Sequence, residues 1–185
     1  MNKKNIMYVL LVLGLSGGAL PSASAADKVK PSAEVEAKLA KVIKDAYPEV
    51  VIKEMARGTE DGLSLVVIQF TSKGNKMDAD VTEDGIIVGT EEAAEITMFP
   101  KPAAKALKKL TKGMKIIDTE IARTYAEADK NDKSGTKAIK LAVPKIAYEM
   151  DVEKGGKKGE FAVSADGTVL ESPEWAKSAG KKEKD

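Results

Sequence analysis

The chain contains an internal repeat. Residues 73–90, KGNKMDADVTEDGIIVGT, align without a gap to residues 155–172, GGKKGEFAVSADGTVLES, at an offset of 82 residues. The preceding segments, SLVVIQFTS at 64–72 and IAYEMDVEK at 146–154, align at the same offset. Because both copies have the same order of apolar and turn-forming residues, the repeat restricts the chain to two similar folded modules.

The two copies differ in length upstream of this alignment. EMAR at 54–57 aligns with EIAR at 120–123, and here the offset is 66 residues. The second copy therefore carries an insertion of 16 residues, around TYAEADKNDKSGTKAIKLAVPK at 124–145. Its polar, turn-forming composition departs from the compact repeat and leaves its role open.

A helical pattern precedes the strands of each copy. In the first copy Ser32 is a suitable N-cap and Pro48 ends the helix. In the second copy the helix begins at Pro102, and Gly113 lies near its end. The apolar residues at helical spacing are Val35, Leu39, Val42, Ile43 and Ala46 in the first helix, and Ala103, Leu107, Leu110 and Met114 in the second. Between the copies, TEEAAEITMF predicts a short linking helix or turn.

Four strand-like runs follow each helix. They cover 50–57, 63–71, 76–82 and 86–89 in the first copy, and 115–124, 145–153, 158–164 and 168–171 in the second. The short connections between them predict hairpins. The predicted fold class is therefore α+β, with two tandem α-β-β-β-β repeats, each a helix packed on one face of a four-stranded antiparallel sheet.

The glycine-containing turns predict the strand register. Gly155-Gly156 and Asp166-Gly167 are interpreted as two-residue turns, in which positive φ is required. The expected cross-strand pairs are Met150 with Phe161, Tyr148 with Val163, Val163 with Leu170, Phe70 with Met77, Ile68 with Ala79, and Val66 with Val81. One face of each sheet is then apolar and requires the helix over it.

The first residues have the pattern of a signal peptide. Lys3 and Lys4 precede an apolar run, and ASA at 23–25 fits a small-residue cleavage site. We therefore expect a signal peptide over 1–25, export to the periplasm or the outside, and no membrane span in the mature chain. Without these residues the chain has 28 basic and 29 acidic side chains, a balance that argues against nucleic acid as a partner.

The composition excludes several kinds of chemistry. The chain has no His and no Cys, which removes the commonest general base, thiol nucleophiles and typical zinc sites. No other catalytic motif is present, so we expect a protein that is not an enzyme and that holds no cofactor or metal. DKNDKSG at 129–135 lacks the ligand spacing of an EF-hand and is interpreted as a solvated loop. Trp175 is interpreted as a packing residue beside the second module.

Acidic side chains alternate with the apolar ones on the strands. In the predicted register they point away from the helix and form an open acidic sheet face, with Asp151 directly opposite Glu160. In the second copy this candidate binding face comprises Asp118, Glu120, Glu149, Asp151, Glu153 and Glu160; Glu54, Asp78 and Asp80 are its counterparts in the first copy. Such a face suits a basic protein surface or a hard cation, although acidic outer faces are also common on solvated sheets.

The second copy resembles the PepSY-like family. The likeness lies in FPKPAAKALKKLTKGMKIIDTEIA and YEMDVEKGGKKGEFAVSADGTVLE, and it is weaker in the first copy, in AKLAKVIKDAYPEVVI and MDADVTEDGIIV. The tandem arrangement is similar to that of β-lactamase inhibitor proteins. The resemblance implies a secreted or periplasmic, non-catalytic binding or inhibitory module, without indicating its target.

These observations lead to a domain plan and two functional hypotheses. The expected parts are a signal peptide at 1–25, a first repeat at 26–92, a second repeat with the insertion at 93–176, and a disordered basic tail at 177–185. The first hypothesis is an exported protein-binding module that inhibits a secreted hydrolase or binds another secreted or periplasmic protein. The alternative is a periplasmic sensor or binding protein for a cation or small ligand. The oligomeric state remains open.

Overall fold

The protein is described here from a computed structural model that covers residues 29–173 and 175. The predicted signal peptide at 1–25 and the predicted tail at 177–185 lie outside these residues. No helix within the described part of the chain has the length and apolar character needed to cross a membrane.

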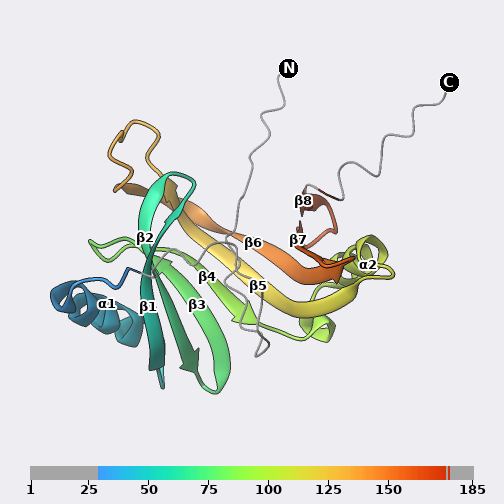
Figure 1. Cartoon of the computed structure of the whole chain (residues 1–185), viewed down its shortest axis with the longest axis horizontal. Coiled ribbons are helices and arrows are strands. Elements are labelled where there is room, and N and C mark those ends of the chain that lie inside the picture. The colour runs from blue at the N-terminus through green and yellow to red at the C-terminus, as the bar shows by residue number, and fades with distance from the viewer. Residues whose placement is uncertain (1–28, 174, 176–185) are drawn as a thin grey trace. The chain divides into compact units, whose positions relative to one another are not determined.

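The order of helices and strands confirms the α+β prediction. Helix α1 (Ala33–Ala46) is followed by β1–β4, and helix α2 (Lys101–Leu110) by β5–β8 (Figure 1). The strands are β1 (Val51–Glu60), β2 (Leu63–Ser72), β3 (Asn75–Val81), β4 (Ile87–Ala93), β5 (Lys115–Ala128), β6 (Ala138–Lys154), β7 (Lys157–Val163) and β8 (Val169–Glu171). They form one eight-stranded antiparallel sheet in chain order, to which each predicted α-β-β-β-β repeat contributes four strands.

The chain divides into two compact units. One contains residues 29–92 and Arg123–Lys145, and the other contains Ala93–Ala122 and residues 146–175. The segment Arg123–Lys145 almost coincides with the insertion at 124–145, so the residues added to the second copy belong to the unit of the first. We call these the first unit and the second unit.

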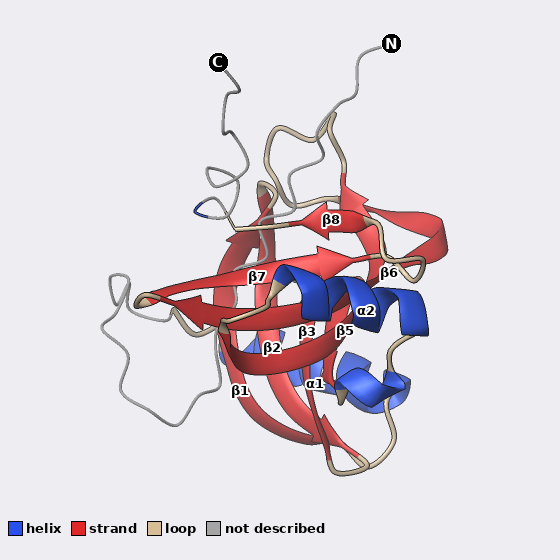
Figure 2. Ribbon diagram, turned by 90° about the vertical axis from the view of Figure 1, so that its right-hand side faces the viewer, coloured by secondary structure: helices blue, strands red, loops and turns tan. Residues whose placement is uncertain are grey.

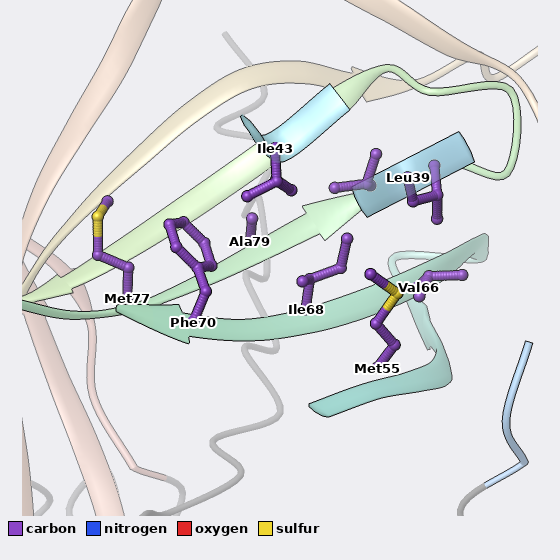
Figure 3. Close-up of a cluster of buried hydrophobic side chains, with 9 residues drawn as sticks. Leu39, Ile43, Met55, Val66, Ile68, Phe70, Met77 and Ala79 are labelled. Atoms are coloured by element: carbon purple, nitrogen blue, oxygen red, sulfur yellow. The ribbon is translucent and has the colours of Figure 1, made fainter. Parts of the chain in front are cut away.

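Helix α1 (Ala33–Ala46) forms the core of the first unit. Ser32 caps it by accepting a hydrogen bond from the Val35 backbone N–H at 3.4 Å, as predicted. Leu39 and Ile43 are fully buried against side chains of β1–β3. Figure 3 shows this cluster, which comprises Leu39, Ile43, Met55, Val66, Ile68, Phe70, Met77, Ala79 and Val81. The predicted pairs Phe70–Met77, Ile68–Ala79 and Val66–Val81 are confirmed.

Helix α2 (Lys101–Leu110) lies across the strands of the second unit (Figure 2). Ala103 and Leu107 are its buried residues. The cluster beneath the helix comprises Ala94, Phe99, Ala103, Leu107, Ile121, Met150, Val152, Phe161 and Val163. Trp175 packs against it with its ring edge-on to Phe161, at 6.3 Å between centroids, and its indole N–H donates to the Lys158 carbonyl at 3.1 Å. The interpretation of Trp175 as a packing residue is therefore confirmed.

The insertion lengthens two strands instead of forming a wholly irregular loop. Strands β5 and β6 continue through most of it, so that only a short loop separates Ala128 from Ala138. Its alanines pack against apolar residues of the first repeat, in a cluster of Leu63, Leu65, Val88 and Ala126 flanked by Ile86, Ala128 and Ala138. The Ser64 backbone N–H donates to the Gly135 carbonyl at 2.6 Å, which ties the loop to the start of β2. These contacts explain why the insertion groups with the first unit.

The turns confirm one part of the predicted register and correct another. Gly155 and Gly156 both have positive φ, 59° and 75°, as a two-residue turn requires, and Met150–Phe161 and Tyr148–Val163 pair as predicted. The Asp166-Gly167 turn is one residue longer than predicted, because the Ser164 backbone N–H donates to the Thr168 carbonyl at 2.9 Å. Val163 consequently pairs with Val169, and the prediction that it pairs with Leu170 is wrong.

The segment between the copies also differs in part from its prediction. A helix or turn is predicted over TEEAAEITMF, but its first residues, Thr90–Ala93, belong to β4. A short 3-10 helix follows, η1 (Ile96–Met98), and the linking helix is limited to these residues.

Candidate functional site

The predicted acidic residues of the second unit lie on β5, β6 and β7. Along β6, Met150 and Val152 belong to the core under α2, so the alternating residues Glu149 and Asp151 point to the opposite side of the sheet. We call this side of the second unit the carboxylate face: Asp118, Glu120, Glu149, Asp151, Glu153, Glu160 and Glu171.

The strand register gathers these side chains around β7. Asp151 pairs directly with Glu160, as predicted, and Glu149 pairs with Ala162. Ala162 also pairs with Glu171 of β8. Two glutamates thus flank a small alanine side chain on neighbouring strands, and a third glutamate, Glu160, lies two residues before this alanine on the same face.

Glu171 was missed at the sequence level although a signal for it existed. The predicted register already placed residue 171 opposite residue 162, on the side of the sheet away from the helix. The signal is weak because the last strand has only three residues, of which Glu171 alone is acidic.

The carboxylate face is less open than the sequence predicts. Glu149 is only 4% exposed and Glu160 only 9% exposed, and the remaining acidic residues of the face are partly buried. The Oε1 atom of Glu160 is buried and accepts no hydrogen bond within the described residues. A buried carboxylate without a hydrogen-bond donor is costly, because the charge loses its hydration without compensation.

Burial and mutual repulsion change the acidity of these groups. Burial, followed by the charges of Glu149 and Asp151, raises the pKa of Glu160 to about 10. Burial and the charge of Asp118 raise the pKa of Asp151 to about 6, against the opposing effect of Lys158. At neutral pH the Glu160 carboxyl is therefore protonated, while Asp151 is largely ionised.

Two acidic residues at the edge of the face have partners within the chain. Glu153 pairs with Lys115 at 3.2 Å and lies opposite Lys158 in the register. Asp118 accepts a hydrogen bond from the Thr119 backbone N–H at 2.8 Å. These two predicted site residues thus have cationic or backbone partners, and the unsatisfied part of the face is the centre around Glu160.

The counterpart in the first unit has a different chemistry. Asp78 lies between Gln69 on β2 and Glu91 on β4 in the register. Burial and the charge of Asp80 raise the pKa of Asp78 to about 6, and a hydrogen bond from Gln69 opposes this shift. Burial also raises the pKa of Asp80 to about 6, with an opposing hydrogen bond from Glu60. Asp78 and Asp80 therefore each have a hydrogen-bonding neighbour, although the Oδ1 atom of Asp78 is buried and accepts no hydrogen bond within the described residues.

The loop of the insertion uses its acidic residue internally. The carboxylate of Asp132 accepts hydrogen bonds from the backbone N–H groups of Ser134, Thr136 and Lys137, at 3.1, 2.9 and 2.9 Å. These bonds, with that of the Ser134 hydroxyl, hold the pKa of Asp132 well below its usual range. The carboxylate thus orders its own loop, in agreement with the interpretation of DKNDKSG as a solvated loop. Across the described ranges, no group of three or more acidic side chains has an arrangement that could hold a metal ion.

The insertion also builds a groove in the first unit that the sequence did not indicate. The groove has a volume of about 830 Å³ and lies between the end of α1, the turn after β3, and the added parts of β5 and β6. It is lined by Val42, Asp45, Ala46, Tyr47, Gly85, Ile86, Ile87, Tyr125, Lys140, Leu141 and Pro144. Its mixed lining includes no catalytic pair of nucleophile and base.

Comparison with known proteins concerns the fold. No protein-family model matches the chain and no curated protein matches it, so the PepSY-like resemblance rests on the motifs in the sequence. Among solved structures, a Bacteroides eggerthii protein described provisionally as periplasmic matches with a TM-score of 0.52 at 13% identity, over 77% of this chain and 87% of that one.

Two further solved structures are similar. A DUF2874 family protein from Bacteroides uniformis has a TM-score of 0.50 at 12% identity, over 76% of this chain and 87% of that one. A BLIP-like protein from Bacteroides fragilis has a TM-score of 0.49 at 16% identity, over 77% of this chain and 86% of that one. At these identities, the matches with TM-scores of 0.52 and 0.50 show that the chain shares its fold with the Bacteroides eggerthii and Bacteroides uniformis proteins, and they carry no statement about its activity.

Proposed function

We propose that the chain is an exported, non-enzymatic protein-binding module of the PepSY-like type, and that its carboxylate face receives a basic surface of another secreted or periplasmic protein. The observation that carries the proposal is the direct pairing of Asp151 with Glu160, whose Oε1 atom is buried and accepts no hydrogen bond. The raised pKa of Glu160 keeps this pair from ionising fully in the free chain, because two like charges directly opposite each other would destabilise the sheet. A cationic partner would turn this internal cost into binding energy and specificity.

Export and the absence of catalysis are supported by the sequence. The charged and apolar start with ASA at 23–25 favours secretion, and the lack of His and Cys removes the commonest catalytic groups. Inhibition of a secreted hydrolase is one form that such binding would take, and the PepSY-like motifs favour it. The intact mass of the exported protein tests the first point: we expect a chain that begins near Ala26, and a mass that includes Met1 would contradict export with cleavage.

The binding proposal is tested with a captured partner. The chain serves as bait in the extracellular fraction of its own source, and the affinity of a purified partner is then measured at two salt concentrations. The variant Asp151→Asn/Glu160→Gln should bind more weakly, and its affinity should depend less on salt, because exposed charge attraction is screened at high ionic strength. Unchanged affinity and salt dependence in this variant would remove the carboxylate face from the binding surface.

Inhibition is tested with the same reagents. If the partner is a hydrolase, its rate of substrate hydrolysis should fall as the chain is added, and the double variant should require a higher concentration for the same effect. A hydrolase that binds the chain and keeps its full rate would contradict the inhibitory form of the proposal and leave protein binding in place.

A further inference from the structure

Three glutamates lie around one small residue at the centre of the carboxylate face. Ala162 pairs with Glu149 on one side and with Glu171 on the other, and Glu160 lies on the same face of β7. Directly paired residues on adjacent strands have Cβ atoms about 5 Å apart. The three glutamates therefore surround a residue whose side chain is a single methyl group.

One buried oxygen atom of Glu160 lacks a hydrogen-bond donor in the described part of the chain. Its side chain is 9% exposed, and its buried Oε1 atom accepts no hydrogen bond within the described residues. It interacts electrostatically with Glu149, Asp151, Glu171 and Glu120, so it lies within the cluster and not at its edge. All of these neighbours are acidic, and none can donate a hydrogen bond when ionised.

We propose that Glu149, Glu160 and Glu171 form a binding site for a single primary ammonium group, supplied by a lysine side chain of the protein partner. This inference rests on the proposed function and names the chemistry of its central contact. An ammonium group has three N–H donors and is a compact point charge, which suits three carboxylates around one small residue. The planar guanidinium of arginine would instead favour one carboxylate in a bidentate contact.

Binding at this site is expected to release a proton. Burial and the surrounding acids raise the pKa of Glu160 to about 10, so its carboxyl is protonated near neutral pH in the free protein. An ammonium group beside it favours the ionised form, and the proton leaves to solvent while the ligand keeps its own charge. The charged groups that face this position are Glu120 and Asp118 on β5, Glu149 and Asp151 on β6, Lys158 on β7, and Glu171 on β8.

A lysine peptide provides the direct test. Hexalysine is titrated into the purified chain by calorimetry near pH 7, in two buffers that differ in ionisation enthalpy, and the difference in heat gives the number of protons released. The control peptide is hexalysine with every side-chain amine acetylated, which keeps the stems and removes the charges. We expect binding of hexalysine with release of about one proton per site, and no binding of the acetylated peptide.

Two variants locate the site on the face. Glu160→Gln should weaken hexalysine binding by about tenfold or more and abolish proton release, because the titrating carboxyl is gone. Glu34→Gln is the control, since Glu34 is an exposed residue of α1 and is not part of the carboxylate face. It should keep the proton release and change affinity by less than about threefold. Equal behaviour of the two variants, or equal binding of both peptides, would overturn the ammonium site.

Other outcomes separate this inference from the proposed function. If a captured partner is weakened by Asp151→Asn and not by Glu160→Gln, the face is correct and the ammonium site is wrong. If hexalysine binds as described but no protein partner is captured, the site stands and the protein-binding proposal fails. A titration with calcium chloride completes the test: calcium binding that requires Glu160, without hexalysine binding, would assign the cluster to a metal ion and overturn the proposal.

Discussion

The two copies of the repeat place different side chains at the same positions of the sheet. On the side away from the helix, the first copy pairs Gln69 with Asp78, and the second pairs Asp151 with Glu160, at the constant offset of 82. The first pair joins an amide donor to a carboxylate, whereas the second joins two carboxyl groups. The backbone arrangement is shared, so the difference in acidity arises from the side chains alone.

The neighbouring positions extend this contrast. Val67 and Gly89 of the first copy correspond to Glu149 and Glu171 of the second, at the same offset. Asp80, which lies between Val67 and Gly89, corresponds to Ala162. In the register the first copy thus has one central acid between two uncharged residues, and the second has two outer acids around a small apolar residue. In the second arrangement a methyl group stands where the first has a carboxylate.

The helix side shows a compensated change instead. Phe70 and Ala79 of the first core correspond to Val152 and Phe161 of the second. At these aligned positions the large ring has moved from one strand to its neighbour, so each pair keeps one phenylalanine. Met77 corresponds to Gly159, where a Cβ atom would lie 2.6 Å from Pro173 because Pro173 and Trp175 occupy that space. Packing preserves total volume on this side, whereas charge on the other side is not compensated within the face.

The largest expected effect tests the core comparison. Phe161→Ala should lower the free energy of unfolding by about 3–5 kcal/mol, because the ring is 3% exposed under α2 and also supports Trp175. Val169→Ala is the control: Val169 is 47% exposed, and its loss should cost less than about 1 kcal/mol. Both values come from urea denaturation, and equal losses would show that the arrangement of β7 under the helix is wrong.

The next effect tests the insertion. Leu65 packs with Ala126 in the first unit, and its counterpart in the second copy is Ala147. Leu65→Ala should cost about 2–5 kcal/mol and should increase amide hydrogen exchange in the added parts of β5 and β6. Ala147→Gly provides a comparison at the equivalent position outside this cluster. A loss of stability without faster exchange in residues 124–145 would contradict the packing of the insertion on the first repeat.

Replacing the Glu160 carboxyl of the carboxylate face should stabilise the chain by an amount that depends on pH. The pKa of Glu160 is raised in the folded chain above its ordinary value of 4.5, so the folded state retains a proton that the unfolded state loses. Stability is therefore highest below about pH 4.5 and falls as pH rises toward the folded pKa of about 10. Glu160→Gln removes this loss and should stabilise the chain by as much as about 3 kcal/mol at pH 7, and by little at pH 4.

Urea denaturation of the wild type and the Glu160→Gln variant at pH 4, 7 and 9 measures this difference. The gain should be larger at pH 9 than at pH 7. At the higher pH, ionisation of Glu160 stabilises the unfolded wild type more strongly, and the variant lacks this ionisation. A gain that is constant across the three pH values would mean that Glu160 does not titrate between them, and that the variant stabilises the fold for another reason.

A smaller effect follows when the chemistry of the second copy is placed in the first. Gln69→Glu puts a carboxylate opposite Asp78 in a buried position and removes the amide donor, which should cost about 1–3 kcal/mol at pH 7. The reciprocal change Asp151→Asn should stabilise the chain slightly by giving Glu160 a donor. If both variants were destabilising, the contrast between the two pairs would not explain the acidity of Glu160.

The smallest effect concerns the loop that only the second copy possesses. Asp132→Ala removes the acceptor of the Ser134, Thr136 and Lys137 amides, so these amides should exchange faster. The midpoint of global unfolding should not change, because the loop is exposed and outside the clusters of buried residues. Hydrogen exchange followed by NMR checks this, with Asp129→Ala as a comparison within the same loop; unchanged exchange would show that Asp132 does not order it.

Local sequence determined the helices, most turns and the main register. Ser32 caps α1 because its hydroxyl reaches a free backbone N–H at the helix start. Gly155 and Gly156 set the β6–β7 register because glycine adopts positive φ without strain, and the one-residue alternation along β6 then divides its side chains between two faces. These features depend on residues close together in the chain, so pattern reasoning could reach them.

The candidate site could be predicted as a set of residues but not as an environment. The register placed Asp151 opposite Glu160 and turned both away from α2, and the structure confirms this. Which carboxyl groups are buried, and which have a cationic partner such as Lys115 beside Glu153, depends on side chains from strands distant in sequence. The pKa of a carboxyl depends on its burial and on these surrounding groups, and not on its own position in a sequence pattern.

Only the tertiary structure decided where the insertion belongs. Its alanines carry no strong periodic signal in the sequence. Their role is seen only in the structure, where they pack against Leu63, Leu65 and Val88. The Asp166-Gly167 turn was decided in the same way, because the bond from Ser164 to Thr168 adds a residue to the turn and shifts Val169 opposite Val163. The sequence alone determined a duplicated α-β-β-β-β pattern with carboxylates on one side; long-range packing determined which of them are buried together, because burial depends on contacts that local sequence does not contain.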